Sequence, residues 1–220
     1  VDLSEGEKEF LTSRFPHAGL SGPVIQIPVS SPPKYSPERF REKYDIRSPY
    51  LLYVGRLDAS KGCLELIHFF INFRSRNAGQ ATLVLIGKGA MNVPKHPAVI
   101  SLGYVDTQTK WDALAGCEWL VNPSAYESLS LVLLEAWNVK RPVLVTAKCD
   151  VMVRQCMLSH GGLWYNGYQE FEKILLHLGD EEKNRLGEQG HTYVQANHRR
   201  NGTQRIMEES VGRIVWDNEQ

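Results

Sequence analysis

The chain has 220 residues, 42% of them hydrophobic and 23% charged, which is an ordinary composition for a globular protein with a sizeable core. Lys and Arg together number 25, as do Asp and Glu, so no net charge attracts nucleic acid or anionic lipid. No apolar run approaches the ~18 residues of a membrane-spanning helix, and the four cysteines form no Cys-x-x-Cys pair. We therefore expect a cytoplasmic protein with reduced, buried thiols, without a nucleic-acid partner or a membrane span.

The first forty residues differ in character from the rest of the chain. A helix is expected over residues 4–15, capped by Ser4, and a strand over residues 24–27. The stretch Ile-Pro-Val-Ser-Ser-Pro-Pro-Lys-Tyr-Ser-Pro that follows is proline-rich and polar, which is typical of a linker. We therefore divide the chain into residues 1–37 and residues 38–220. The start lacks both methionine and a signal peptide, so an excised fragment of a longer protein is expected.

From about residue 48 onward, short apolar runs alternate with helical patterns. Strands are expected over residues 50–54, 81–86, 99–102, 119–122, 142–145 and 163–165. Helices are expected over residues 63–73, 107–115, the segment containing Glu135, 151–158, 170–178, 181–196 and 203–215. The strands are too uniformly apolar to have one face in water, which favours a parallel sheet covered on both sides. The predicted fold is a Rossmann-like, doubly wound α/β domain. In its first helix, one face is predicted to carry Leu64, Ile67, His68 and Ile71.

Two glutamates, Glu127 and Glu135, stand eight positions apart around an apolar run. Burying the second carboxylate costs several kcal/mol unless it finds hydrogen-bond donors. If the run is helical, Glu135 lies about two turns into it, so Glu127 is at the helix start and Glu135 on the helix wall behind it. Two such carboxylates could bind the hydroxyls of a sugar and of a ribose. The alternative is chance spacing, because most helical glutamates are solvated surface residues.

Charged residues follow the first strand in the segment Tyr-Val-Gly-Arg-Leu-Asp-Ala-Ser-Lys-Gly. Gly55 allows a tight turn, and Arg56 and Lys61 lie near the start of the next helix, where backbone amides and cations together suit an anion. Because ligands of open α/β sheets bind at the carboxyl ends of the strands, we expect a phosphate site here. The alternative is that the two cations are ordinary exposed loop residues.

Two further segments fall at the same edge of the predicted sheet. Gly87, Lys88 and Gly89 follow the second strand, but Asn92 occupies the place of the third glycine of a dinucleotide-binding motif, so a nicotinamide cofactor is not expected. The helix that starts near Ser130 could direct its amides toward a phosphate. The seven histidines are scattered without metal-ligand spacing, so we expect no metal site.

Together these segments resemble the group 1 glycosyltransferases (family 4, retaining, with the GT-B fold), specifically their carboxyl-terminal, donor-binding domain. The matching pieces run in the family's order: Gly-Arg-Leu-Asp-Ala-Ser-Lys-Gly, Leu-Val-Leu-Ile-Gly-Lys-Gly, Leu-Gly-Tyr-Val, Asn-Pro-Ser-Ala-Tyr-Glu-Ser-Leu-Ser-Leu-Val-Leu-Leu-Glu-Ala and Arg-Pro-Val-Leu-Val-Thr-Ala. The two glutamates eight apart, followed by Ala and a Pro-Val strand, are the most specific part. The resemblance covers roughly residues 50–178. It implies that residues 1–37 are the remnant and linker of an amino-terminal acceptor domain.

The resemblance implies transfer of a hexose from a nucleotide-diphosphate sugar to an unidentified acceptor, with retention of configuration and without a metal or cofactor. Arg56 and Lys61 would hold the diphosphate. Glu127 would bind the transferred sugar and Glu135 the ribose hydroxyls. At the helix start, the phosphates would be approached by the backbone amides of Leu129, Ser130 and Leu131. The nucleobase would be contacted by Gly103, Tyr104 and Val105.

The sequence departs from the family pattern in two places. Ser130 stands where many relatives have glycine, and residues 147–151 replace a glycine-rich loop, so Gly161 and Gly162 are expected to supply small residues to the pocket instead. Because the acceptor domain is missing, the fragment is expected to bind the donor without turning it over alone, and any peripheral membrane association would involve that domain. Two alternatives remain open: a non-catalytic nucleotide-sugar-binding module, and a relative with epimerase or phosphorylase chemistry.

Overall fold

The computed structural model describes residues 12–14, 16, 27–77, 79 and 81–198. Six parallel strands form one sheet in the order β3-β2-β1-β4-β5-β6. The strands are β1 (Tyr50–Val54), β2 (Thr82–Ile86), β3 (Val99–Gly103), β4 (Trp119–Asn122), β5 (Val143–Thr146) and β6 (Gly162–Tyr165). The predicted Rossmann-like, doubly wound α/β fold is therefore confirmed. Three expected elements lie outside the described residues, wholly or for the most part. They are the helix over residues 203–215, the strand over residues 24–27 except its last residue, and most of the helix over residues 4–15.

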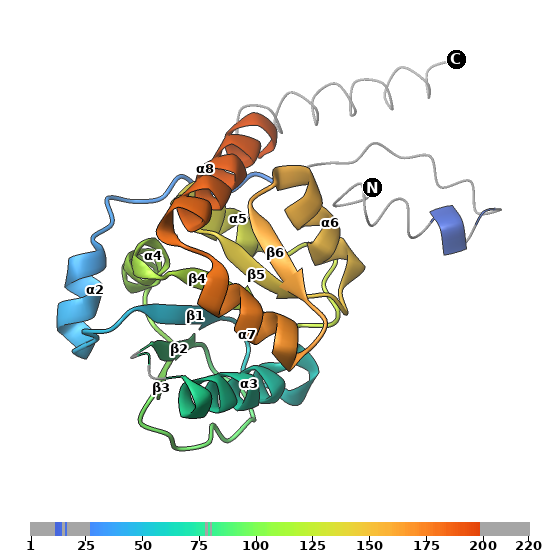
Figure 1. Ribbon diagram of the computed structural model, residues 1–220. Coiled ribbons are helices and arrows are strands. Elements are labelled where there is room, and N and C mark those ends of the chain that lie inside the picture. Colours follow the sequence, from blue (N-terminus) through green and yellow to red (C-terminus); the bar gives the residue numbers. More distant parts are fainter. Residues whose placement is uncertain (1–11, 15, 17–26, 78, 80, 199–220) are drawn as a thin grey trace, which may run out of the picture.

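Helices connect and cover the strands (Figure 1). They are α2 (Pro37–Tyr44), the short 3-10 helix η1 (Ala59–Lys61), α3 (Cys63–Arg76), α4 (Thr107–Gly116), α5 (Leu131–Asn138), α6 (Asp150–Ser159), α7 (Tyr168–His177) and α8 (Asp180–Asn197). The predicted helices between residues 63 and 196 are all present. In the described part of the chain, no helix is both long and apolar enough to cross a membrane.

The sheet separates two hydrophobic cores, because successive side chains of each strand point to opposite faces. Leu51 and Tyr53 of β1 pack with residues of α3 and α7 on one face, whereas Tyr50 and Leu52 pack with residues of α4, α5 and α6 on the other. Burial on both faces explains why the strands are uniformly apolar. All four cysteines are buried and free, which confirms the expected reduced thiols.

The predicted inward face of the first helix was wrong by one position. The buried stripe of α3 consists of Cys63, Leu66, Ile67, Phe70 and Phe73, while Leu64 is 41% exposed. A 3.6-residue period fits both stripes, and the larger aromatic side chains of the second one fill the space against the sheet.

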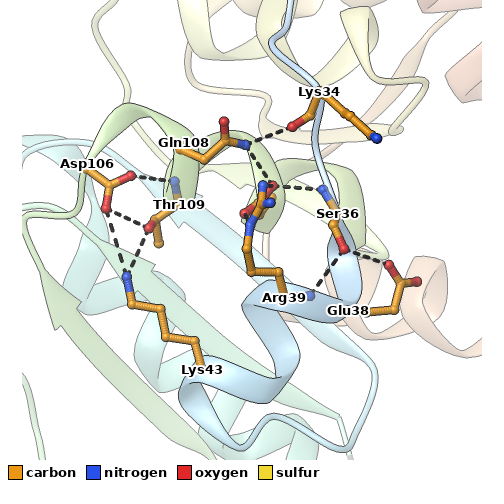
Figure 2. A network of polar contacts seen from close by, with 9 residues as sticks. Lys34, Ser36, Glu38, Arg39, Lys43, Asp106, Gln108 and Thr109 are labelled. Atoms are coloured by element: carbon orange, nitrogen blue, oxygen red, sulfur yellow. Dashed lines mark hydrogen bonds and ion pairs between the residues drawn. The ribbon is translucent and has the colours of Figure 1, made fainter.

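A polar network fastens α2 to α4 (Figure 2). Asp112, whose side chain is 3% exposed, accepts hydrogen bonds from Arg39 at 2.6 and 2.7 Å, one to each carboxylate oxygen. The Ser36 amide donates to the same carboxylate at 2.8 Å, and Gln108 donates both to it and to the Lys34 carbonyl. The linker and α2 therefore hold the start of α4 in place.

The end of α8 holds the earlier part of the linker. The Val29 amide donates to the His198 carbonyl at 3.0 Å, and the His198 ring nitrogen Nδ1 lies 3.0 Å from the Ile27 carbonyl oxygen. Asn138 of α5 donates to the Ser30 carbonyl at 3.1 Å. Residues 27–36 thus cross the helices on one face of the sheet instead of standing apart from it.

Candidate functional site

The candidate site lies at the carboxyl edge of the sheet, where the loops after β1, β2, β3 and β4 meet. From β1 the chain passes to β2 and β3 on one side and later to β4 on the other, so the strand order reverses between β1 and β4. Such a reversal leaves a crevice outside the strand ends, which is where ligands of open α/β sheets bind. Each predicted site segment follows one of these four strands.

The loop after β1 carries Arg56 on a fixed backbone. The Tyr53 hydroxyl donates to the Arg56 carbonyl at 2.8 Å, which ties the loop to the strand below it. The Arg56 side chain is 67% exposed, and its Nε lies 2.7 Å from Asp58 Oδ2. A hydrogen bond from the Ser60 hydroxyl, aided by the Arg56 charge, lowers the pKa of Asp58. Arg56 is therefore a largely exposed cation on the cavity wall, paired with Asp58.

Lys61 and Glu127 form an ion pair that joins two of the predicted segments. Lys61 ends η1, and its Nζ lies 2.7 Å from Glu127 Oε1 in the loop after β4. Their side chains are 24% and 19% exposed, so the ion pair is only partly accessible to water. Charged groups at this degree of burial attract each other more strongly than in bulk water. Sixty-six residues apart in sequence, the predicted phosphate cation and sugar carboxylate are thus neighbours.

Glu135 has a lysine partner of its own. It lies on α5, and its Oε1 is 2.6 Å from the Nζ of Lys110 on α4, with side-chain exposures of 20% and 25%. The expectation that this carboxylate must find a donor is confirmed. The helix begins at Leu131, so Glu135 lies only about one turn into it, not two, and Glu127 precedes the helix by a short loop. Residues 128–130 are extended or turning chain, which moves the helix start away from Glu127.

Backbone close approaches shape the floor of the crevice. Gly87 has φ +142°, and a Cβ there would overlap with the Gly55 carbonyl oxygen. Gly62 has φ +69°, and a Cβ would overlap with the carbonyl of Pro123. The loop after β2 is further joined to its neighbours, because the Gly87 amide donates to the Gly103 carbonyl at 2.8 Å. Glycine is therefore required at positions 62 and 87 for the loops to cross.

A cavity of about 260 Å³ opens among these loops. Six of the predicted binding residues line it, together with Val54, Ile86 and Lys110: Gly55, Arg56, Gly87, Lys88, Tyr104 and Val105. Tyr104 is 75% exposed and offers an aromatic face beside the cavity. Lys61, Glu127 and Glu135 do not line this cavity but lie on segments next to it. The structure thus gathers part of the predicted set around one hollow, while Gly103, Lys61 and the three residues at the start of α5 lie outside its lining.

The start of α5 is bonded within the protein. Ser130 is buried, its hydroxyl accepts a hydrogen bond from Asn122 at 3.0 Å, and its amide donates to Gln155 at a long 3.5 Å. Leu131 at the first helical position is 46% exposed. Of the residues predicted to offer amides here, Ser130 faces inward, while its neighbours Leu129 and Leu131 are at least partly exposed.

Two expectations about the site need correction or addition. Gly161 and Gly162 lie at the amino end of β6, where they pack on Trp137, Gly190 and Val143, so they are at the opposite edge of the sheet from the cavity. Lys110 was not predicted, because nothing in the sequence links it to Glu135, 25 positions later.

Two larger hollows, of about 550 and 400 Å³, lie at the amino ends of the strands. Residues that precede β1, β2 and β3 line the first, and residues that precede β4 and β5 line the second. Size alone would favour them. The smaller cavity is the better candidate because it lies at the carboxyl ends of β1, β2 and β3, the edge of an open α/β sheet where ligands bind, and because the paired charges lie on segments next to it.

The fold and the position of this cavity define the class of protein, a Rossmann-like, doubly wound α/β domain with a cavity at the carboxyl edge of its sheet. Residues 48–178, more than half of the chain, match the family model described as Glycosyl transferases group 1, so the chain belongs to that family. An uncharacterised glycosyltransferase of Methanocaldococcus jannaschii is 30% identical in an alignment 125 residues long, which covers 52% of this chain and 31% of that protein.

Solved structures show the same fold at low sequence identity. HepE of Anabaena, in complex with UDP-glucose, has a TM-score of 0.79 at 14% identity, covering 96% of this chain and 62% of HepE. The carboxyl-terminal domain of the group 1 glycosyltransferase LpcC of Francisella tularensis has a TM-score of 0.62 at 18% identity, covering 78% of this chain and 97% of that domain. The chain therefore has the fold of one half of a GT-B glycosyltransferase, and it spans about a third of its curated relative.

Proposed function

We propose that this chain is the donor-binding half of a retaining glycosyltransferase, which transfers a hexose from a nucleotide-diphosphate sugar to an acceptor. The observation that carries the proposal is the pairing of each predicted carboxylate with a lysine at the carboxyl edge of the sheet, Glu127 with Lys61 and Glu135 with Lys110. Membership of the family and the complex of HepE with UDP-glucose support it.

Each side chain has a chemical task in this proposal. Arg56 and Lys61 bind the diphosphate and stabilise the charge that develops on it as the bond to the sugar breaks. A preorganised donor or cation of this kind is typically worth about 2.7–4 kcal/mol in the transition state. Glu127 accepts hydrogen bonds from the sugar hydroxyls, and Glu135 accepts them from the ribose hydroxyls. Tyr104 and Val105 provide a surface for the nucleobase, and no metal is needed because the cations supply the positive charge.

Retention is proposed to follow from attack on the same face that the leaving group departs from. The bond between the sugar C1 and the diphosphate oxygen breaks, and a bond from C1 to the acceptor oxygen forms. The proton of the acceptor hydroxyl passes to the departing phosphate. The acceptor would be bound by an amino-terminal domain that this chain lacks, so the chain alone binds the donor in the cytoplasm without transferring sugar efficiently.

Calorimetric titration tests the proposal with UDP, GDP and ADP and their common sugar conjugates. We expect one base to bind selectively and Glu135→Ala to weaken that binding. Glu188→Ala serves as a matched control, because Glu188 pairs with Lys140 in an exposed contact on α8, away from the cavity. Failure of all nucleotides to bind the unaltered chain would contradict the proposal. Efficient sugar transfer by the 220-residue chain alone would contradict only the part of it that makes the chain inactive without an acceptor domain.

A further inference from the structure

Lys110 contacts both the cavity and the Glu135 carboxylate. It lines the cavity together with Gly55, Gly87 and Tyr104, and its ammonium lies 2.6 Å from Glu135, which is not itself in the cavity wall. The ammonium therefore connects the hollow to the carboxylate behind it. Resting on the proposed function, we propose that Lys110 is a positioning residue that sets recognition of the donor ribose through Glu135.

The direction of the Glu135 carboxylate depends on a partner of this kind. A carboxylate has two oxygens with about four acceptor positions. With only 20% of its side chain exposed, Glu135 needs a hydrogen-bond donor from the protein to hold it in one orientation. The Lys110 ammonium, bonded to Oε1, fixes the carboxylate and leaves Oε2 with its acceptor positions for two ligand hydroxyls.

The ribose of a nucleotide is the part of the donor that suits such an acceptor. Its two neighbouring hydroxyls are both donors and point the same way, so one carboxylate can accept from both. A carboxylate whose direction is fixed accepts both bonds without first losing rotamer freedom. The pair thus favours a ribonucleotide over an analogue without the hydroxyls, because the latter leaves a desolvated acceptor unpaired.

The helix that carries Lys110 is held rigidly. The Asp106 carboxylate caps the amino end of α4 by accepting from the Thr109 amide at 2.7 Å, and the Lys110 amide donates to the Asp106 carbonyl at 3.0 Å. The Lys110 ammonium also lies 5.4 Å from the centre of the Trp111 ring, a cation–π distance. Together with the Arg39–Asp112 contact, which ties α4 to α2, these bonds hold the helix segment that carries Lys110.

The test compares binding of a ribonucleotide with that of its 2′,3′-dideoxy analogue, using whichever of UDP, GDP or ADP binds the unaltered chain. Titrations are repeated on Lys110→Met and Lys110→Arg, with folding checked by thermal melting. We expect the unaltered chain to prefer the ribonucleotide by about 10- to 100-fold, the value of hydrogen bonds to a charged group. The methionine variant should lose most of that preference and the arginine variant should keep most of it. The Glu135→Gln substitution should have little further effect in the methionine variant.

Lys43→Met is the matched control, because Lys43 contacts Thr109 of the same helix at 3.1 Å but does not line the cavity. It should leave the preference unchanged. If Lys110→Met weakens both nucleotides equally, the lysine contacts the phosphates or supports the fold, and the inference is overturned. A chain that binds none of the nucleotides overturns the proposed function itself and this inference with it, so the two failures are distinguishable.

Discussion

The Lys61 ammonium lies 2.7 Å from the Glu127 carboxylate, which joins the end of η1 to the loop that precedes α5. A diphosphate that approaches Lys61 would compete with Glu127 for the ammonium, while sugar hydroxyls would replace the ammonium at the carboxylate. In the proposed function, the ion pair is exchanged for contacts with the two halves of a sugar diphosphate.

Replacing Lys61 by alanine is expected to weaken nucleoside diphosphate binding about 10- to 100-fold, the loss of ~1.5–3 kcal/mol that a hydrogen bond to a charged group typically contributes. Calorimetry on the purified chain measures the change. Lys148→Ala is the control, since Lys148 forms a comparable 2.8 Å contact with Glu65 in an exposed position. Unaltered affinity in the Lys61 variant would remove this residue from the site.

Alanine at Gly87 is expected to destabilise the fold and to impair binding. Its φ of +142° is strained for any residue with a Cβ, and that Cβ would meet the Gly55 carbonyl, so the loops after β1 and β2 must separate. Backbone strain of this kind costs about 1–3 kcal/mol, and the overlap adds to it. Urea unfolding measures the loss. The control is Gly79→Ala, because a Cβ at Gly79 has open space around it and should change the urea midpoint of unfolding little. An equal loss of stability in both variants would refute the argument that the loops after β1 and β2 require glycine at position 87.

The Arg39–Asp112 contact predicts a dependence of stability on pH below about 5. Burial raises the pKa of Asp112, but hydrogen bonds, first among them that from Arg39, lower it overall. A carboxyl with a lowered folded-state pKa stabilises the fold above its unfolded value of about 3.9, and this contribution is lost as the pH falls through the lower folded value.

Arg39→Ala should remove this stability and leave a buried carboxylate. Because Arg39 is half exposed, the cost should fall well below that of breaking a fully buried ion pair. Urea unfolding at pH 7 and across pH 5 to 3 measures both effects. Arg47→Ala, which breaks an exposed pair with Asp45, should have almost no effect. A stability curve with the same acid slope in both variants would contradict the prediction.

His198 predicts a second, milder acid sensitivity. Burial lowers its pKa, although the contact with the Ile27 carbonyl opposes the shift. Since the unfolded chain takes up the proton first, stability should be full above about pH 6.5 and should fall as the pH drops from there toward the lower folded-state pKa. His198→Gln should flatten the stability between pH 7 and 5, as measured by chemical unfolding. A slope that persists in this variant would point to other groups.

The sheet could be predicted because strands buried on both faces need apolar residues at every position, a pattern visible between residues 50 and 165. Arg56 and Lys61 could be proposed because they lie between a strand and the next helix, and the two glutamates because they stand eight positions apart around an apolar run. The buried face of α3 could not be predicted, because a stripe through Leu64 and a stripe through Leu66 both fit the helical period. Only packing against the sheet decides which of the two stripes is buried.

Lys110 escaped prediction for a different physical reason. Its contact with Glu135 joins two helices through tertiary packing, and a single sequence carries no signal for a contact 25 positions apart. The prediction that Gly161 and Gly162 line the pocket was wrong because glycine can make space at either end of a strand. Here the space lies at the amino end of β6 and is filled by Trp137 instead of a ligand. Local chemistry was readable from the sequence, while side-chain partners depended on the fold.

Hydrogen–deuterium exchange of the chain, with and without its nucleotide sugar, tests the central claim most directly. Ligand bound at the carboxyl edge should slow exchange in the loops after β1, β2 and β3 and at the start of α5, over residues 55–62, 87–89, 103–105 and 127–135. Exchange around the larger hollows at the amino edge, including residues 45–48 and 96–98, should not change. Protection confined to the amino edge, with none at Glu127 and Glu135, would contradict the account.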